Sequence, residues 1–225
     1  MHIHFIGIGG IGTSALAKYY LARGHTLSGS DLSSSEITEE LERLGVQVAT
    51  GKHNKKNLPE NTERVIFTAA ARATNPELKE AARRNIPRQT YAEALGDLTR
   101  RHKTITISGA HGKSTTTALA ALVLEEGYCD PTVIVGTKVR EFGDSNCRVG
   151  KSKYLIIEAD EHFASFLNYW PDIIVLTTIE ADHLDYYKNI ENILRSFQTY
   201  VSQLPKDGII VANKDDKNVV RVADS

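Results

Sequence analysis

Short apolar segments of β type alternate with segments of helical periodicity along the whole chain. The strand-type segments predicted from this pattern are residues 2–6, 26–29, 65–70, 105–107, 133–135, 154–158, 173–178 and 209–212. Between them, helices are predicted over residues 13–23, 37–44, from Pro76 onward, 91–102, 118–124 and 189–204. Strands that alternate with helices form parallel sheets, so the pattern predicts an α/β protein with a doubly wound parallel sheet.

A glycine-rich segment, SGAHGKSTTT at residues 108–117, joins one predicted strand to the helix that follows it. Such a turn presents unpaired backbone N–H groups at the positive end of the helix dipole, where a phosphate binds. Lys113 adds a cation for the outer phosphates, and the Ser114 hydroxyl can ligate Mg²⁺. The usual pattern has a glycine where Ile107 stands, so the loop is a shortened variant. It predicts nucleoside triphosphate binding, and a capped helix N-terminus without a ligand is the alternative.

A second glycine loop, residues 7–12, satisfies the dinucleotide-binding fingerprint near the N-terminus. Asp31 ends the next predicted strand, where such folds place a ribose-binding acid. Alone, this loop predicts an NAD-dependent oxidoreductase. The triphosphate-type loop in the same chain favours instead an enzyme that joins a nucleotide-linked substrate to ATP chemistry.

Two buried-type strands run directly into acidic residues. Glu158, Asp160 and Glu161 follow the apolar residues 155–157, and Glu180, Asp182, His183 and Asp185 follow the strand that begins at Ile173. The carboxyl ends of parallel strands border the crevice where doubly wound sheets bind ligands, so a functional role is expected. Because Mg²⁺ prefers oxygen ligands, His183 as a direct ligand would be unusual.

Composition excludes several classes of partner. The formal net charge is -1, with both signs spread along the chain, so no electrostatic footprint for nucleic acid or a membrane surface is present. Cys129 and Cys147 have no metal-ligand spacing and are expected to be free thiols of a reducing compartment. No apolar run reaches membrane-spanning length, and the protein is expected to be cytoplasmic.

The motifs together resemble the ATP-dependent Mur ligases of bacterial cell-wall synthesis. The GxHGKS loop, the Glu-Ala-Asp-Glu strand end at 158–161 and the Ile-Glu-Ala-Asp-His-Leu-Asp segment at 179–185 occur in the family's order. The opening HFIGIGGIG and the Asn75-Pro76-Glu77 helix start point, within the family, to a ligase that joins L-alanine to UDP-N-acetylmuramate. The resemblance implies that the substrate carboxylate attacks the γ-phosphate of ATP, and that the amino group displaces the resulting acyl phosphate.

The resemblance also implies two domains and a set of site residues. Residues 1–100 would form a Rossmann-like, parallel-sheet domain that binds the UDP substrate, and residues 101–225 a P-loop-type α/β ATP-binding domain that is incomplete. The implied contacts with the UDP substrate are Gly9, Gly10, Ile11 and Gly12 at the pyrophosphate, Asp31 and His53 near the nucleoside, and Glu161 near the muramyl group. The implied ATP contacts are Gly109, Ala110, His111, Gly112, Lys113, Ser114 and Thr115. Lys113, Glu158 and His183 would be catalytic, with Ser114 and Glu158 on one Mg²⁺ and His183 on a second.

The chain also departs from the family pattern. It stops soon after a strand and a polar turn, before the segments that hold adenine and before the third domain that binds the amino acid. His162 and Phe163 replace the common Ser-Asp pair, and an extra residue precedes His53. A murein-peptide recycling ligase and a non-catalytic UDP-sugar or nucleotide-binding module therefore remain alternatives.

Overall fold

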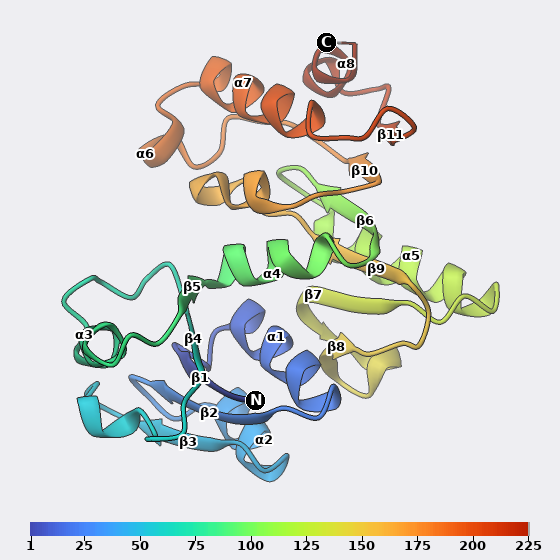
Figure 1. The fold of residues 1–225 in the computed structure, drawn as a ribbon. Helices are drawn as coiled ribbons and strands as arrows, with labels where there is room; N and C mark the ends of the chain where they lie inside the picture. The colour runs from blue at the N-terminus through green and yellow to red at the C-terminus, as the bar shows by residue number, and fades with distance from the viewer. Residues whose placement is uncertain (225) are drawn as a thin grey trace. The chain divides into compact units, whose positions relative to one another are not determined.

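The computed structural model describes residues 1–224, which divide into two compact units. The first unit comprises residues 1–94 together with 140–147, and the second comprises 95–139 and the chain from Arg148 onward. Each unit is built on its own sheet (Figure 1). The predicted domain boundary near residue 100 stays a prediction.

The first unit has a five-stranded sheet in the order β3-β2-β1-β4-β5, and every neighbouring pair is parallel. Its strands are β1 (His2–Ile6), β2 (Thr26–Asp31), β3 (Gln47–Thr50), β4 (Arg64–Phe67) and β5 (Arg88–Thr90). The helical elements are α1 (Ile11–Ala22), α2 (Glu36–Arg43), the 3₁₀ turn η1 (Lys55–Asn57) and α3 (Pro76–Arg83). The strand order reverses at β1, so the crevice for a ligand lies at the carboxyl end of β1, where the first glycine loop follows.

Local sequence signals position these helices as predicted. Gly24 and Gly45 follow α1 and α2 with φ of +81° and +91°, the left-handed conformation that ends a helix. At the start of α3, the Asn75 side chain accepts hydrogen bonds from the backbone N–H groups of Glu77 and Leu78. Glu77 thereby occupies the first turn of α3, where the helix dipole stabilises a negative charge.

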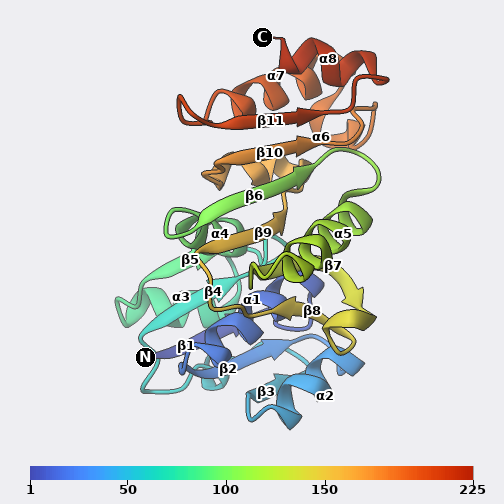
Figure 2. The same cartoon turned by 90° about the vertical axis from the view of Figure 1, so that its right-hand side faces the viewer.

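The second sheet has six strands in the order β11-β10-β6-β9-β7-β8, and all of them except most of β8 belong to the second unit. Its strands are β6 (Lys103–Ser108), β7 (Thr132–Val139), β8 (Ser145–Arg148), β9 (Tyr154–Glu158), β10 (Ile173–Leu176) and β11 (Ile209–Ala212). Helices α4 (Tyr91–Thr99), α5 (Lys113–Glu126), α6 (Leu184–Tyr187), α7 (Ile190–Val201) and α8 (Lys217–Ala223), with the 3₁₀ segments η2 (Arg140–Phe142) and η3 (His162–Asn168), complete the chain. The five strands from β11 to β7 are parallel, and Figure 2 shows β6, β10 and β11 side by side. The prediction of an α/β fold with parallel sheets is confirmed.

Burial explains why the strands of the second sheet read as continuous apolar runs. Leu155, Ile156 and Ile157 of β9 are fully buried, because a central parallel strand is covered on both faces. The apolar face of α7 also packs inward, with Leu194 and Phe197 buried. Among the described residues, no helix is long and apolar enough to cross a membrane.

Several local predictions were wrong. The strands predicted over 65–70 and 173–178 end at Phe67 and Leu176, and the helix predicted over 91–102 ends at Thr99. Residues 217–223 form α8 where only a polar turn was expected. The Asp216 side chain caps α8 by accepting from the N–H groups of Asn218 and Val219. The short strands β3, β5 and β8 were missed because their residues, QVAT, RQT and SNCR, carry no run of apolar positions.

Candidate functional site

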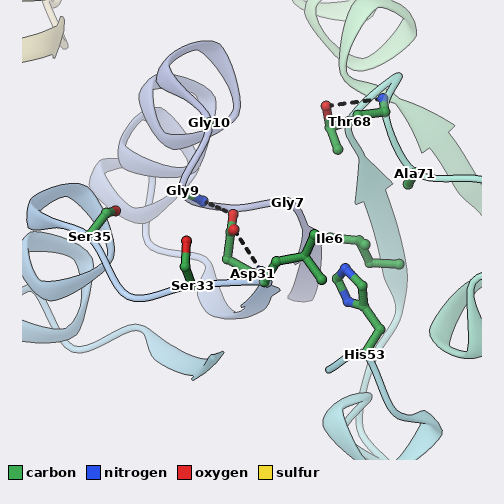
Figure 3. Close-up of a pocket in the computed structure, with 12 residues that line it drawn as sticks. Ile6, Gly7, Gly9, Gly10, Asp31, Ser33, Ser35, His53, Thr68 and Ala71 are labelled. Atoms are coloured by element: carbon green, nitrogen blue, oxygen red, sulfur yellow. Dashed lines mark hydrogen bonds between the residues drawn. The ribbon is translucent and has the colours of Figure 1, made fainter. Parts of the chain in front are cut away.

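The first glycine loop is held against the end of β2 by its own backbone. The N–H groups of Gly7 and Ile8 donate to the Ser30 carbonyl at 2.8 and 3.1 Å. Asp31 Oδ2 accepts from the Gly9 N–H at 2.8 Å, and its Oδ1 accepts from the Leu32 N–H at 2.7 Å (Figure 3). In this structure the Asp31 carboxylate therefore fixes the shape of the loop as well as standing beside it.

A pocket of about 390 Å³ opens beside this loop (Figure 3). Gly10, which lines it, is the N-cap of α1, and that helix has neither a side-chain cap nor an acidic residue in its first turn. The pocket thus combines the positive end of a helix with three glycines that allow a ligand close to the backbone. It is lined by Ile6, Gly7, Gly9, Gly10, Asp31, Leu32, Ser33, Ser35, His53, Thr68, Ala70 and Ala71.

Four of the six residues predicted to contact the UDP part of the substrate lie in this pocket. They are Gly9, Gly10, Asp31 and His53, whereas Ile11 and Gly12 are not among its lining residues. Gly12 has a different structural reason to be glycine. A Cβ built there would lie 2.8 Å from Cζ of Tyr91, which is closer than side chains tolerate.

We expect Gly12→Ala to destabilise the chain although alanine favours a helix by roughly 1 kcal/mol over glycine. The added methyl group must displace the Tyr91 ring, and such overpacking costs typically 1–3 kcal/mol. Urea unfolding followed by circular dichroism measures the change. Combining Gly12→Ala with Tyr91→Ala should cost less than the two single losses added together. Strict additivity would contradict the contact.

Beneath the pocket lies a buried carboxylate that the sequence analysis missed. Both oxygens of Glu77 accept hydrogen bonds: Oε2 from His4 Nε2 at 3.0 Å and Ser30 Oγ at 2.6 Å, and Oε1 from His53 Nδ1 at 3.0 Å. The Asn57 side-chain amide donates to Oε1 at 2.9 Å. Burial alone would raise the pKa of Glu77, but the hydrogen bonds from His4, Ser30 and His53 outweigh it and lower the pKa to about 2.

This lowered pKa predicts acid sensitivity. Because the folded-state pKa of Glu77 lies below its ordinary value of 4.5, its stabilising contribution is complete above about pH 5. The contribution is lost as the pH falls toward 2, and a shift of this size corresponds to on the order of 3 kcal/mol. We expect the free energy of unfolding, measured by urea titration from pH 6 to pH 2, to fall accordingly. Glu77→Gln should flatten that fall, and an unchanged slope would contradict the assignment.

In the second unit, the phosphate-type loop runs from the end of β6 to the start of α5. Gly112 is the N-cap of α5 with φ of +80°, and no side chain caps the helix. The N–H groups of Ala110 and His111 donate to the Thr178 carbonyl and hydroxyl at 2.8 and 3.1 Å. These two N–H groups are therefore engaged, whereas the first turn of α5, which contains Lys113, Ser114 and Thr115, presents uncapped N–H groups to a phosphate.

Lys113 is engaged with acidic residues that follow β9. Its Nζ donates to the Gly109 carbonyl at 2.7 Å and to Glu161 Oε2 at 3.0 Å, and lies 3.8 Å from Asp160 Oδ1. Glu161, predicted near the muramyl group, is buried at 3% exposure. A phosphate that reaches Lys113 must therefore either displace the Glu161 carboxylate from the Lys113 ammonium group or bind that ammonium group together with it.

The ends of β9 and β10 bring acids and imidazoles together beside this loop. These strands are the two neighbours of β6 in the sheet. His183, in a left-handed conformation with φ of 51°, belongs to two groups of potential metal ligands whose donor atoms lie within 4.8 Å of one another. One group is Asp160, Glu161 and His183, and the other is His162, His183 and Asp185.

Glu158 lies apart from those groups. It ends β9, and its Oε1 accepts from the Gly136 N–H at 2.8 Å. Among the described residues it belongs to neither cluster around His183. Glu158 and His183, two predicted metal ligands, thus have different neighbouring residues. Ser114, the third, is half-buried and lies in the first turn of α5 next to Lys113. Their assignment to two separate ions stays a prediction.

One signal in the sequence could have revealed more of the site. His2 and His4 alternate on the otherwise apolar β1, which indicates a buried polar partner on one face. A second feature is visible only in the structure: His162 precedes a strained segment, because Phe163 and Ala164 both have left-handed backbone conformations with φ of 54° and 53°. The His162 ring stacks on that of His183 with centroids 4.1 Å apart.

Comparison with known proteins matches both units to one family. Residues 2–103 match the Mur ligase family, catalytic domain, and residues 107–225 match the Mur ligase middle domain. The UDP-N-acetylmuramate–L-alanine ligase of Clostridium acetobutylicum is 46% identical over 98% of this chain, and that of Acetivibrio thermocellus is 41% identical over 98%. The chain covers 48% and 47% of those two proteins, so it spans about half the length of the curated relatives it matches.

Solved structures agree with this assignment. The UDP-N-acetylmuramate–alanine ligase of Thermotoga maritima superposes with a TM-score of 0.88 at 30% identity, covering 99% of this chain and 51% of that one. The UDP-N-acetylmuramate:L-alanyl-γ-D-glutamyl-meso-diaminopimelate ligase of Neisseria meningitides superposes with a TM-score of 0.90 at 27% identity, covering 99% and 74%. Both comparisons extend over the two glycine loops and the acidic strand ends, and the chain belongs to the Mur ligase family.

Proposed function

We propose that this chain supplies the UDP-N-acetylmuramate site and the ATP site of a ligase that joins L-alanine to UDP-N-acetylmuramate. The observation that carries the proposal is that one chain contains two sites suited to phosphates. One is the pocket at the first glycine loop and the N-terminus of α1, and the other is the Lys113 loop beside the acidic ends of the neighbouring strands. The relatives that are 46% and 41% identical bear the name of that ligase.

The first unit fits the UDP moiety. A pyrophosphate needs backbone N–H groups at a positive helix end, and α1 begins at Gly10 with no acidic residue in its first turn. Asp31 occupies the neighbouring Gly9 N–H, so the groups left for the phosphates are those of the α1 first turn. The neighbouring hydroxyls, Ser33 and Ser35, and the His53 imidazole supply polar contacts for a nucleoside. None of these contacts is specific for a nicotinamide ring, so only the glycine fingerprint itself supports the oxidoreductase alternative.

The second unit fits Mg²⁺ and ATP by the chemistry of its donors. The first turn of α5 offers uncapped N–H groups, and Lys113 offers the cation for the outer phosphates. The Ser114 hydroxyl and the Glu158 carboxylate are oxygen donors of the kind that Mg²⁺ prefers, and His183 with Asp160 and Glu161 forms a second donor set. Bound magnesium would neutralise charge as the substrate carboxylate approaches the triphosphate.

In the proposed reaction this chain's residues bring two anions together. Lys113 and the α5 N-terminus hold the γ-phosphate while the muramyl carboxylate attacks it, ADP leaves, and the acyl phosphate forms. The amino group of L-alanine then displaces phosphate to form the amide. The chain covers 48% of the relative from Clostridium acetobutylicum, and we infer that groups binding the amino acid belong to the part not covered.

Calorimetric titration of this chain with UDP-N-acetylmuramate tests the proposal, with NADH titrated in parallel. Binding of the muramyl nucleotide and no heat from NADH is the expected result. NADH binding without muramyl nucleotide binding would overturn it and return the first loop to redox chemistry. Binding of the nucleotide, but no ATP-dependent phosphate release once the full-length protein is assayed with L-alanine, would identify a non-catalytic binding module.

The acceptor needs its own comparison, because the structural likeness to the ligase from Neisseria meningitides favours a second candidate. That ligase is named for a tripeptide acceptor and matches 99% of this chain. We expect the full-length protein to release phosphate with L-alanine and not with the tripeptide L-alanyl-γ-D-glutamyl-meso-diaminopimelate. The reverse preference would make it a murein-peptide recycling ligase.

A further inference from the structure

The His53 ring stands between the pocket of the first unit and the buried Glu77 carboxylate. Its Nδ1 lies 3.0 Å from Glu77 Oε1 and 3.2 Å from Ser30 Oγ. His53 is also one of the residues that line the pocket (Figure 3). Within residues 1–224, no hydrogen-bond partner of its Nε2 is found.

The hydrogen bonds determine which nitrogen of His53 carries the proton. An ionised carboxylate only accepts hydrogen bonds, so Nδ1 must be the donor toward Glu77. The Ser30 hydroxyl leads to the same conclusion. Its one proton is directed to Glu77 Oε2 at 2.6 Å, so only its lone pairs face His53, and Nδ1 must carry the proton. In the neutral ring the lone pair is then on Nε2.

Glu77 itself is locked in place from behind. His4 Nε2 donates to its Oε2, His4 Nδ1 accepts from Ser28 Oγ at 2.8 Å, and His2 Nε2 lies 2.8 Å from the same hydroxyl. The Asn57 amide and the Asn54 N–H complete the set on Oε1. All of these hydrogen bonds to Glu77 can be made by neutral donors. The network therefore does not require the His53 ring to carry a second proton and a positive charge.

We propose that Glu77 is a positioning residue for the nucleotide site: through Nδ1 it fixes the tautomer and orientation of His53, so that Nε2 accepts a hydrogen bond from a ribose hydroxyl or the imide N–H of uracil. The inference rests on the proposed function for the identity of the ligand, but not for the state of His53 in the free protein. It assigns His53 an acceptor role and excludes a cationic contact with the pyrophosphate.

The first test needs no ligand. Long-range ¹H–¹⁵N spectra of the histidine rings at pH 8 should show His53 as the Nδ1–H tautomer, with the signal assigned by its disappearance in His53→Ala. Glu77→Gln should convert His53 toward the Nε2–H form, because a carboxamide can donate to Nδ1. A wild-type Nε2–H tautomer would overturn the proposal even if the Glu77 variant does not fold.

The second test is a double-mutant cycle with UDP as the calorimetric probe. His53→Ala and Glu77→Gln should each weaken UDP binding by about tenfold, the size expected for one lost hydrogen bond in a desolvated site. The double variant should bind no more weakly than His53→Ala, because Glu77 acts through His53. Losses that multiply would make Glu77 merely structural. Glu80→Gln, on the same helix but paired with exposed Arg83, is the matched control and should leave UDP affinity unchanged.

The pH dependence of UDP affinity distinguishes a neutral His53 that accepts a hydrogen bond from a cationic His53 that contacts phosphate. Protonation of Nε2 removes its lone pair, so an acceptor role predicts that acidification weakens wild-type UDP binding relative to His53→Ala. The other titratable groups around the ring are Glu77, His4 and, across the pocket, Asp31, and the His53→Ala profile subtracts their effect. Affinity that instead rises on acidification would overturn the acceptor role. If UDP does not bind at all, the proposed function fails, whereas the tautomer measured in the free protein still decides the position of His53.

Discussion

Lys113→Ala should lower the affinity of this chain for Mg·ATP by roughly 10- to 100-fold, the loss expected for a hydrogen-bonded charge removed from a phosphate site. Lys113 is the only lysine or arginine of the loop at residues 108–117, and it begins the helix whose N-terminus faces the loop. Nothing else in the loop offers a positive charge on a flexible stem. Titration calorimetry with Mg·ATP measures the change, and UDP affinity, read in a parallel titration, should stay constant.

A second variant separates lost binding from lost folding. Removing Lys113 leaves the buried Glu161 carboxylate without its cation, and uncompensated buried charges cost up to about 3–5 kcal/mol. Adding Glu161→Gln should restore the free energy of unfolding but not the ATP affinity. Recovery of ATP affinity in that double variant would show that Lys113 acts by neutralising Glu161 and not by binding phosphate. Glu161→Gln alone releases Lys113 but also removes one carboxylate of the second donor set for Mg²⁺, so its Mg·ATP affinity shows which of these two effects is larger.

The parallel sheets and both glycine loops were predictable because their signals are local and strong. Central strands such as β9 are apolar at every interior position, and the helix ends at Gly24 and Gly45 follow from the positive φ that glycine allows. The strands β3 and β5 were not predictable from periodicity. They are held in the sheet by pairing with β2 and β4, which is a property of the tertiary structure.

The sequence predicted which residues belong to the site, but not which of them form hydrogen bonds or ion pairs with one another. The loop around Lys113 and the acids after β9 follow from motif and strand order, yet the ion pair between Lys113 and Glu161 depends on how two strand ends meet. Gly12 was assigned to a pyrophosphate, and the structure shows the Tyr91 ring against it. Glu77 was visible only as part of a helix start, because its five donors come from three other segments of the chain.

The two glycines of the phosphate-type loop offer the sharpest stability test. Both have positive φ, +135° at Gly109 and +80° at Gly112, but their surroundings differ. A Cβ at Gly109 would lie 2.3 Å from Thr177 Oγ1 and 2.6 Å from the Thr178 carbonyl. At Gly112 the nearest atom would be Thr116 Oγ1 at 4.0 Å. Backbone strain is thus common to both positions, whereas overlap with the segment after β10 belongs to Gly109 alone.

Gly112→Ala should therefore cost about 1–2 kcal/mol, the penalty of a left-handed alanine. Gly109→Ala adds overlap with a backbone that cannot rotate away, so its cost should reach about 3–5 kcal/mol. Thermal and urea unfolding of the two variants measure the difference, and Mg·ATP titration shows whether the loop has moved. Equal losses would mean that the Thr177–Thr178 segment yields freely. In that case the hydrogen bonds from Ala110 and His111 to Thr178 would not hold the loop in the shape that leaves the α5 N-terminus open to phosphate.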